Sequence, residues 1–237
     1  MTTIHLEDVV CSNCGAQSRH PVLGSTNQFG FPDLDLRPPE MQRSTMGAWL
    51  QECPACGLVT PSLDDKSIDD QVALKSSEYL LVRNDCSLPP LARRFMCGAI
   101  ISEARREPYV AFQRMLCAAW VADDANLSEL ARACRLKAAA YLERQSGLHL
   151  PQKAQLLDVL RRAGAWDTAE TLAAELAAGG LDERMARIVA FQVTLIGRRD
   201  GSRYTVKDAI PPSPQLPKQK VPPPPSFVTR LRHWMRS

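Results

Sequence analysis

Two short cysteine clusters constrain this chain more than any other feature. In each, two cysteines stand two residues apart and a glycine follows: Cys11 and Cys14 before Gly15, and Cys53 and Cys56 before Gly57. A tight turn of this kind points both sulfurs at one place, and the glycine accepts the positive φ that the turn requires. Two such turns supply four soft ligands in a tetrahedron, which is typical of a closed structural zinc site. The sequence therefore predicts a structural Zn²⁺ held by Cys11, Cys14, Cys53 and Cys56.

Two disulfides, or four unrelated thiols, are the alternatives to zinc. Residues 1–10 have no basic region and no long apolar run, so they do not resemble a secretory signal. No stretch approaches the roughly 18 consecutive apolar residues of a membrane span. The expected location is cytoplasmic, where thiols stay reduced, and this favours zinc over disulfides.

The distribution of charge argues against nucleic acid as a partner. Residues 211–237 contain five basic residues and no acidic one, and without them 24 basic residues face 26 acidic residues. Residues 1–65 hold eight acidic residues and only three arginines. Four thiolates around Zn²⁺ would add about two more negative charges. A ribbon that binds DNA or RNA needs a basic face, so nucleic acid is not an expected partner.

Four regions follow from composition and periodicity. Residues 1–65 are expected to form a small β zinc-ribbon module, with short strands at 9–10, 48–50 and 58–60. Residues 66–209 are expected to form an α-helical domain of stacked hairpins. Residues 210–225 are a proline-rich linker, and residues 226–237 a short basic amphipathic helix. The predicted fold class is mainly α, with a disordered proline-rich tail before the terminal helix.

Helix start and stop signals divide the helical region further. Ser67 with Asp70 resembles a capping box and opens a helix to about Val82, and Asn126 is expected to cap a later helix. Prolines and glycines mark most of the other boundaries. Five of the expected helices cover 67–82, 89–106, 151–163, 167–178 and 182–197. Two more are expected, one that starts at Pro108 and one that starts at Asn126 and ends before Gly147.

The segment 160–169 resembles the helix-turn-helix junction of a tetratricopeptide repeat. In that family a small residue ends the first helix, an aromatic residue fills the turn, and an alanine packs the second helix closely. Gly164, Trp166 and Ala169 stand at these positions, and the match covers about residues 153–178. An ordinary helical bundle is the alternative.

The end of the chain suggests a tethered recognition element. Eight of the sixteen residues 210–225 are proline, which favours an extended spacer over a ligand for aromatic grooves. Beyond it, apolar residues at helical spacing form one stripe, with a basic back face. We expect this stripe to bind a protein partner; docking on its own helical domain and contact with a membrane surface are the alternatives. The stripe consists of Phe227, Val228, Leu231, Trp234 and Met235.

Two further predictions concern polar and sulfur-containing residues. The charged loop 31–43 between the cysteine clusters is expected to be solvated, with local Asp–Arg pairing; a surface for a basic partner is the alternative. The remaining cysteines lack the spacing of metal ligands and are expected in the core. They are Cys86, Cys97, Cys117 and Cys134.

No catalytic motif is present in the sequence, and a saturated four-cysteine site leaves no open position for catalysis. We therefore expect a non-enzymatic adaptor or scaffold that mediates protein–protein interaction through its helical repeats and its terminal helix. A nucleic-acid or transcription-associated ribbon protein is the second hypothesis. A zinc-dependent enzyme, which would need a non-cysteine ligand or an open metal position, is the third.

The stretch 33–39, together with 49–57 and its C-P-x-C-G motif, resembles an uncharacterised family of bacterial proteins. Members pair a split N-terminal zinc ribbon with a tetratricopeptide-like helical tail. Cys11, Cys14, Cys53 and Cys56 match the metal positions of that family, and the resemblance covers about residues 9–200. Leu58 and Val59 stand where the family has an aromatic residue and an alanine. The resemblance implies the fold and the metal ligands, and no activity.

Overall fold

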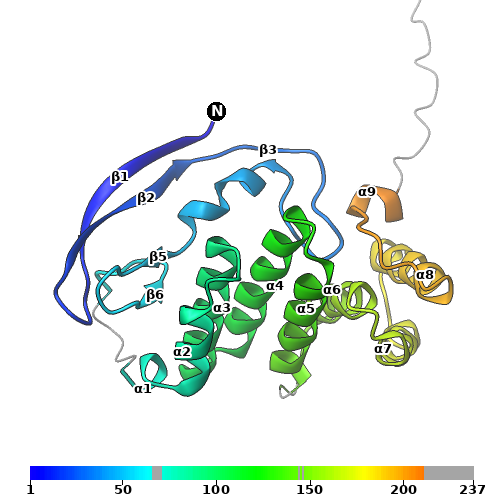
Figure 1. The fold of residues 1–237 in the computed structure, drawn as a ribbon. Coiled ribbons are helices and arrows are strands. Elements are labelled where there is room, and N and C mark those ends of the chain that lie inside the picture. The colour runs from blue at the N-terminus through cyan, green and yellow to red at the C-terminus, as the bar shows by residue number, and fades with distance from the viewer. Residues whose placement is uncertain (66–70, 144, 146, 211–237) are drawn as a thin grey trace, which may run out of the picture.

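A row of helices with an N-terminal β region curving over it makes up the structure (Figure 1). The computed structural model of the 237-residue chain describes residues 1–65, 71–143, 145 and 147–210. The chain is mainly helical, and a small β region precedes the helices, which confirms the predicted fold class at this level. No helix in the described part of the chain is long and apolar enough to cross a membrane.

In the part of the chain that the structure describes, six strands pair into three antiparallel hairpins. They are β1 (Thr3–Val10) with β2 (Gln17–Ser25), β3 (Gln28–Phe29) with β4 (Glu40–Met41), and β5 (Gln51–Glu52) with β6 (Val59–Thr60). The strands expected at 9–10 and 58–60 are confirmed within β1 and β6. The strand expected at 48–50 is wrong, because the 3-10 helix η1 (Gln42–Ala48) occupies this region. Contacts of Trp49 stabilise the helical turn of η1. Its indole N–H donates to Thr45 Oγ1 (2.8 Å), and its ring packs edge-on against Phe95.

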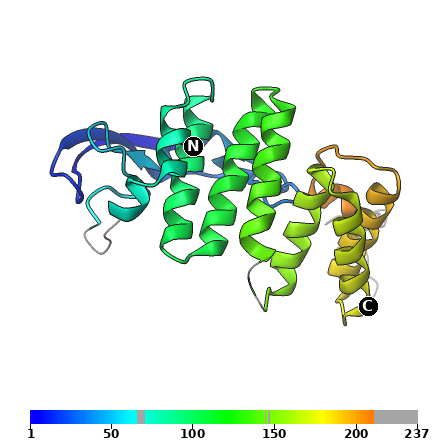
Figure 2. The ribbon, with the colours of Figure 1, turned by 60° about the horizontal axis from the view of Figure 1, so that its bottom comes forward.

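The helices stand side by side, from the β region at one end to α8 and α9 at the other (Figure 2). Proline in the first turn of α3, α4 and α6 starts these helices where the sequence predicts, since its missing N–H would have no helical partner there. The helices are α1 (Gln71–Leu74), α2 (Ser77–Asn84), α3 (Pro90–Ala104), α4 (Pro108–Asp124), α5 (Ser128–Glu143), α6 (Leu150–Arg162), α7 (Trp166–Ala178), α8 (Glu183–Gly197) and α9 (Val206–Ala209).

The hairpin of α6 and α7 contains the residues for which the sequence resembles a tetratricopeptide junction, a resemblance that stays a prediction. Gly164 in the turn has φ of +69°, a conformation that glycine adopts without a steric penalty. Ala169 is fully buried, so α7 approaches its neighbours closely. Asp182 then caps α8 by accepting a hydrogen bond from the backbone N–H of Met185 (2.7 Å).

Two helix boundaries differ from the sequence prediction. The single helix expected over 67–82 is wrong in its described part, because Ser76 interrupts it and accepts a hydrogen bond from Tyr79 N–H to start α2. Asn126 does not cap α5. It lies in the left-handed region (φ +57°) and ends α4, where the backbone N–H of Leu127 donates to Ala122 O (2.9 Å).

One hydrophobic core runs from the cysteine clusters to α8. Gly98 in the middle of α3 allows the β region to approach, since a Cβ there would stand 3.0 Å from Leu50 Cδ1. Among the four cysteines predicted to lie in the core, Cys97, Cys117 and Cys134 are buried, as expected. Cys86 is exposed, so the prediction is wrong for this residue: it follows the end of α2, where the chain turns at the surface.

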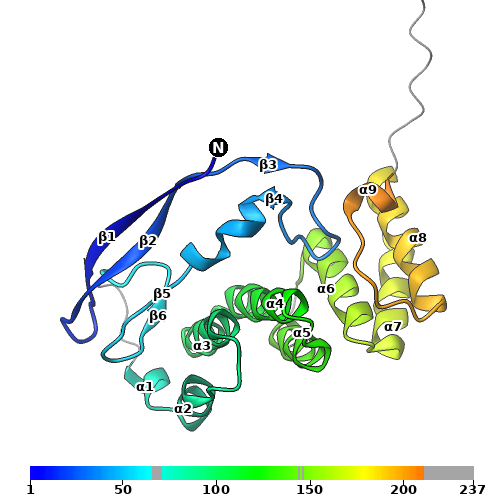
Figure 3. The ribbon, with the colours of Figure 1, turned by 45° about the horizontal axis from the view of Figure 1, so that its top comes forward.

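Three charged residues of the loop 31–43 between the cysteine clusters are buried, so the prediction of a solvated loop is wrong for them. The predicted local Asp–Arg pairing is confirmed, because Arg43 Nη2 donates to Asp33 Oδ1 (2.8 Å). Asp33, Asp35 and Arg37 are each no more than 1 % exposed. The Asp35 carboxylate accepts a hydrogen bond from the Trp120 indole N–H (2.8 Å) and pairs with Arg162 (2.8 Å). The loop therefore exchanges its solvation for a hydrogen bond to α4 and an ion pair with α6. Figure 3 shows the chain between β3 and β4 passing beside these helices.

A chain of alternating charges extends from this loop into the helices. Arg162 pairs with Asp35 and also with Asp123 (2.7 Å), and Asp123 pairs in turn with Arg135 of α5 (2.5 Å). Burial opposes the charge of Arg162, but the carboxylates of Asp35, Asp158 and Asp123 outweigh it and raise the pKa of the guanidinium. The cluster thereby ties the loop to α4, α5 and α6.

The same loop also meets the last described residues of the chain. The backbone N–H of Val206 donates to Pro32 O (2.9 Å), and that of Leu34 donates to Tyr204 O (2.9 Å). Asp33 forms an isolated antiparallel bridge with Thr205. The loop thus lies between the helices and the segment that contains α9.

We predict that Asp35→Ala lowers the free energy of unfolding by about 3–5 kcal/mol, because it leaves the buried Arg162 without this partner. Chemical denaturation followed by circular dichroism measures the change. Asp8→Ala is the matched control: its pair with Arg19 (3.7 Å) lies at the surface, so stability should change little. Equal losses in the two variants would contradict a structural role for the buried pair.

Candidate metal centre

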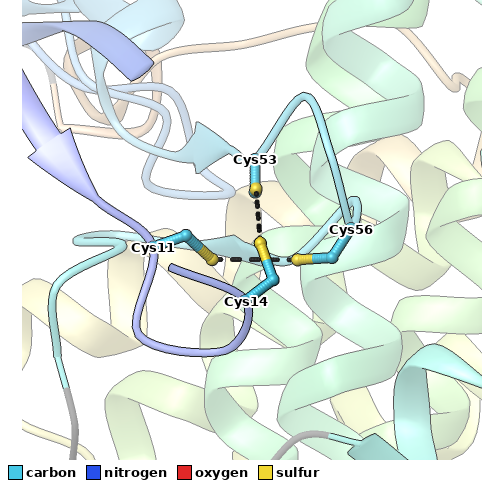
Figure 4. A group of neighbouring side chains, drawn as sticks. All are labelled: Cys11, Cys14, Cys53 and Cys56. Carbon is cyan, nitrogen blue, oxygen red and sulfur yellow. Dashed lines mark hydrogen bonds between the residues drawn. The ribbon is translucent and has the colours of Figure 1, made fainter. Parts of the chain in front are cut away.

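Two neighbouring hairpins place the four cysteines around one point (Figure 4). The turn after β1 carries Cys11 and Cys14, and the turn between β5 and β6 carries Cys53 and Cys56. The Cys11 and Cys56 sulfurs lie 3.7 Å apart, and those of Cys14 and Cys53 lie 3.6 Å apart. All four sulfurs lie within 4.8 Å of one another. The structure therefore brings together the four residues that the sequence singles out.

These distances fit a tetrahedral metal ion and exclude disulfides in this structure. A metal with four sulfurs at about 2.3 Å requires neighbouring sulfurs to stand about 3.8 Å apart. A disulfide bond requires about 2.05 Å. All eight cysteines are free thiols, so the four clustered ones can hold a metal ion.

The two turns share one backbone pattern. The N–H of Gly15 donates to Cys11 O (2.8 Å), and the N–H of Gly57 donates to Cys53 O (2.9 Å). Both glycines are left-handed, with φ of +75° and +79°. The repeated cysteine–glycine spacing thus produces two equivalent turns whose sulfurs face each other.

Backbone hydrogen bonds contribute to lowering the pKa of one of the four thiols. Burial opposes ionisation of the Cys53 thiol, but hydrogen bonds from the backbone N–H groups of Cys56 and Ala55, together with the Cys14 and Cys56 thiols, lower its pKa to about 7. Burial raises the pKa of the Cys11 thiol to about 12. Binding a metal would draw all four groups into the thiolate form, because the thiolate is the ligand.

Helix α2 holds the second turn in place, a feature that the sequence analysis missed. The Tyr79 hydroxyl donates to Gly57 O, and Arg83 Nη1 donates to Cys56 O (3.1 Å). The only signal in the sequence is the four-residue spacing of Tyr79 and Arg83, which places them on one helix face.

A cavity of about 590 Å³ between the buried loop and the helices α3 and α4 was also missed. Its walls include Trp49, Phe95 and Trp120, with Leu36 of the loop and Arg114 of α4. The aromatic residues come from three distant parts of the sequence, so no local pattern indicates the cavity.

The stripe predicted to bind a partner lies outside the described residues. This applies to Phe227, Val228, Leu231, Trp234 and Met235. Comparisons with protein families, with curated proteins and with solved structures gave no match for this chain. The resemblance to a bacterial ribbon family therefore stays a prediction, while the cysteine cluster and the helical body stand on the geometry described above.

We predict that Gly57→Ala is more damaging than Gly15→Ala. Both variants force a residue with a side chain into a left-handed turn, at a cost of about 1–2 kcal/mol. A Cβ at position 57 would also stand 2.3 Å from the Arg83 guanidinium, whereas one at position 15 meets nothing within 4 Å. Displacing Arg83 breaks its bond to Cys56 O and costs about 1 kcal/mol more.

Denaturant unfolding of the two variants measures this difference in stability. Equal stability losses would show that Arg83 does not support the second turn.

Proposed function

We propose that this protein is a non-enzymatic, zinc-binding adaptor, in which a structural Zn²⁺ stabilises the N-terminal turns and the helical region binds other proteins. The observation that carries the proposal is the closed arrangement of four sulfurs. Four cysteine ligands complete a tetrahedron and leave no position for a substrate or a reactive water, which argues against a catalytic metal.

Zinc is the metal that we assign to the site. A tetrahedral set of four thiolates suits zinc or iron, and zinc is the usual ion where the role is to hold two tight turns together. Two short turns that no regular hydrogen-bond ladder joins within residues 1–65 gain stability from a metal that links them. The ion would act on the helices as well, because Cys11 and Cys53 belong to the same hydrophobic core as α3 and α4.

Protein binding is supported by apolar surface on the helical region. The cavity beside Trp49 and Trp120 has the size and aromatic lining of a site that receives a side chain or a small ligand. The apolar stripe 227–235, beyond the proline-rich segment, is the second element that we assign to partner binding. The excess of acidic residues in 1–65 disfavours nucleic acid as the target.

We predict that the purified protein contains one equivalent of zinc and that a strong chelator lowers its melting temperature by about 5 °C or more, because two turns of the core lose their cross-link. Elemental analysis and thermal unfolding measure these quantities. Cys53→Ser should lose the metal. Cys86→Ser, at an exposed cysteine outside the cluster, should keep it.

Bound iron would contradict the assignment of zinc. Full zinc content in Cys53→Ser would contradict the assignment of the ligands.

A second prediction tests the adaptor role. Affinity capture from the native lysate with the full chain should enrich a protein partner, and Leu231→Glu should reduce its recovery about tenfold by placing a charge in the apolar stripe. Thr229→Glu is the matched control, since Thr229 lies outside the stripe.

Quantitative mass spectrometry of the captured proteins measures the effect. Recovery of nucleic acid in place of protein, or equal recovery of the partner with both variants, would contradict the proposed use of the stripe.

A further inference from the structure

The last helical hairpin of the row consists of α7 and α8 (Figure 2). An open apolar groove runs between these two helices. It consists of two adjoining hollows of about 390 and 510 Å³, which share Ala177 and Val193. Most of its lining is alanine and glycine: Ala173, Ala174 and Ala177 on α7, and Ala186, Ala190 and Gly197 on α8. Val193 is 47 % exposed at the centre.

The shape and lining of this groove are those of a binding site for another helix. In stacked helical hairpins each pair covers the apolar face of the pair before it, and a terminal hairpin normally has a polar outer face. Here the surface is apolar, and small residues at helical spacing let a second backbone approach closely. Within residues 71–143 and 147–210 no further helix covers it.

The described part of the chain ends beside this hairpin. Val206 and Ala209 of α9, together with Ile210, pack against Ile188 and Phe191 of α8. Residues 211–225 can span up to about 46 Å in an extended polyproline conformation. A helix is only about 10–12 Å wide. The terminal segment 226–237 can therefore reach the groove around α8.

The dimensions and charges of the two partners match. From Ala186 to Gly197 the groove extends along about 17 Å of helix axis, and residues 226–236 would form a helix of about the same length. The stripe at 227–235 contains large apolar side chains, and the groove is lined mainly by small residues, so the two surfaces are complementary in shape. Among the described residues that line the groove, Glu170 alone is charged, whereas residues 211–237 carry only basic charge.

We propose that the groove between α7 and α8 binds residues 226–237 of the same chain as an amphipathic helix. The carboxylate of Glu170 at the edge of the groove attracts the arginines of the segment. Docking occupies the apolar stripe, so a protein partner of that stripe must displace it from the groove. This inference goes beyond the adaptor function and does not depend on it.

Photo-crosslinking of the full-length, zinc-loaded protein tests the proposal. Trp234 is replaced by photo-reactive p-benzoylphenylalanine, and the crosslinked peptides are mapped by mass spectrometry at low and at high protein concentration. We expect crosslinks within one chain to peptides that contain residues 170–177 or 186–197, with a yield that does not depend on concentration. Crosslinks between two copies, crosslinks to other surfaces, or none at all would overturn the proposal.

A matched pair of variants makes the test specific. Val193→Glu places a charge in the centre of the groove and should reduce the crosslink yield about tenfold. Thr194→Glu adds the same charge at the next exposed position of α8, outside the groove lining, and should leave the yield unchanged. Unchanged melting temperatures show that both variants fold. An equal yield in the two variants would overturn the proposal, whatever the affinity capture shows.

Discussion

The ion pair between Asp35 and Arg162 is the interaction on which the position of the N-terminal loop 31–43 against the helices depends. Both side chains are almost completely removed from water, at 0 % and 6 % exposure. A buried charge without its partner costs several kcal/mol, so the loop is stable in this position only if the helices supply the guanidinium and the indole N–H of Trp120. The loop belongs to the segment that connects the two cysteine turns, so this pair anchors that segment to α6.

The parts of the fold that follow from local chemistry could be predicted from the sequence. Prolines at helix starts, glycine in the α6–α7 turn and the repeated cysteine–glycine spacing each act within a few residues, and the structure has the corresponding helices, turn and sulfur cluster. The burial of Asp35 could not be predicted in this way. Its partners lie 85 and 127 residues away, and a charged loop with prolines is ordinarily solvated. The sequence predicts only residues 9–10 of strand β1. Most of β1 is exposed on both faces, so it lacks the alternation of apolar and polar residues that marks a half-buried strand.

The metal centre and the helices support each other through few but direct contacts. Tyr79 and Arg83 bind carbonyl oxygens of the second turn, so the orientation of α2 fixes two of the four sulfurs. Gly98 allows Leu50, which directly precedes β5, to pack closely on α3. The helical row thus accommodates a segment of its own N-terminal region along one face. In our proposal it accommodates a segment of its own C-terminal region in the groove of α7 and α8.

The long separation between Asp35 and Arg162 has a consequence for how the protein is made. During synthesis the loop leaves the ribosome well before α6 exists, so the Asp35 carboxylate remains without Arg162 until 127 more residues have been added. Contacts so distant in sequence slow folding, because a long loop must close before they contribute. The N-terminal turns can capture a metal early, while the loop that follows them can take its position on the helices only after α6 has been synthesised.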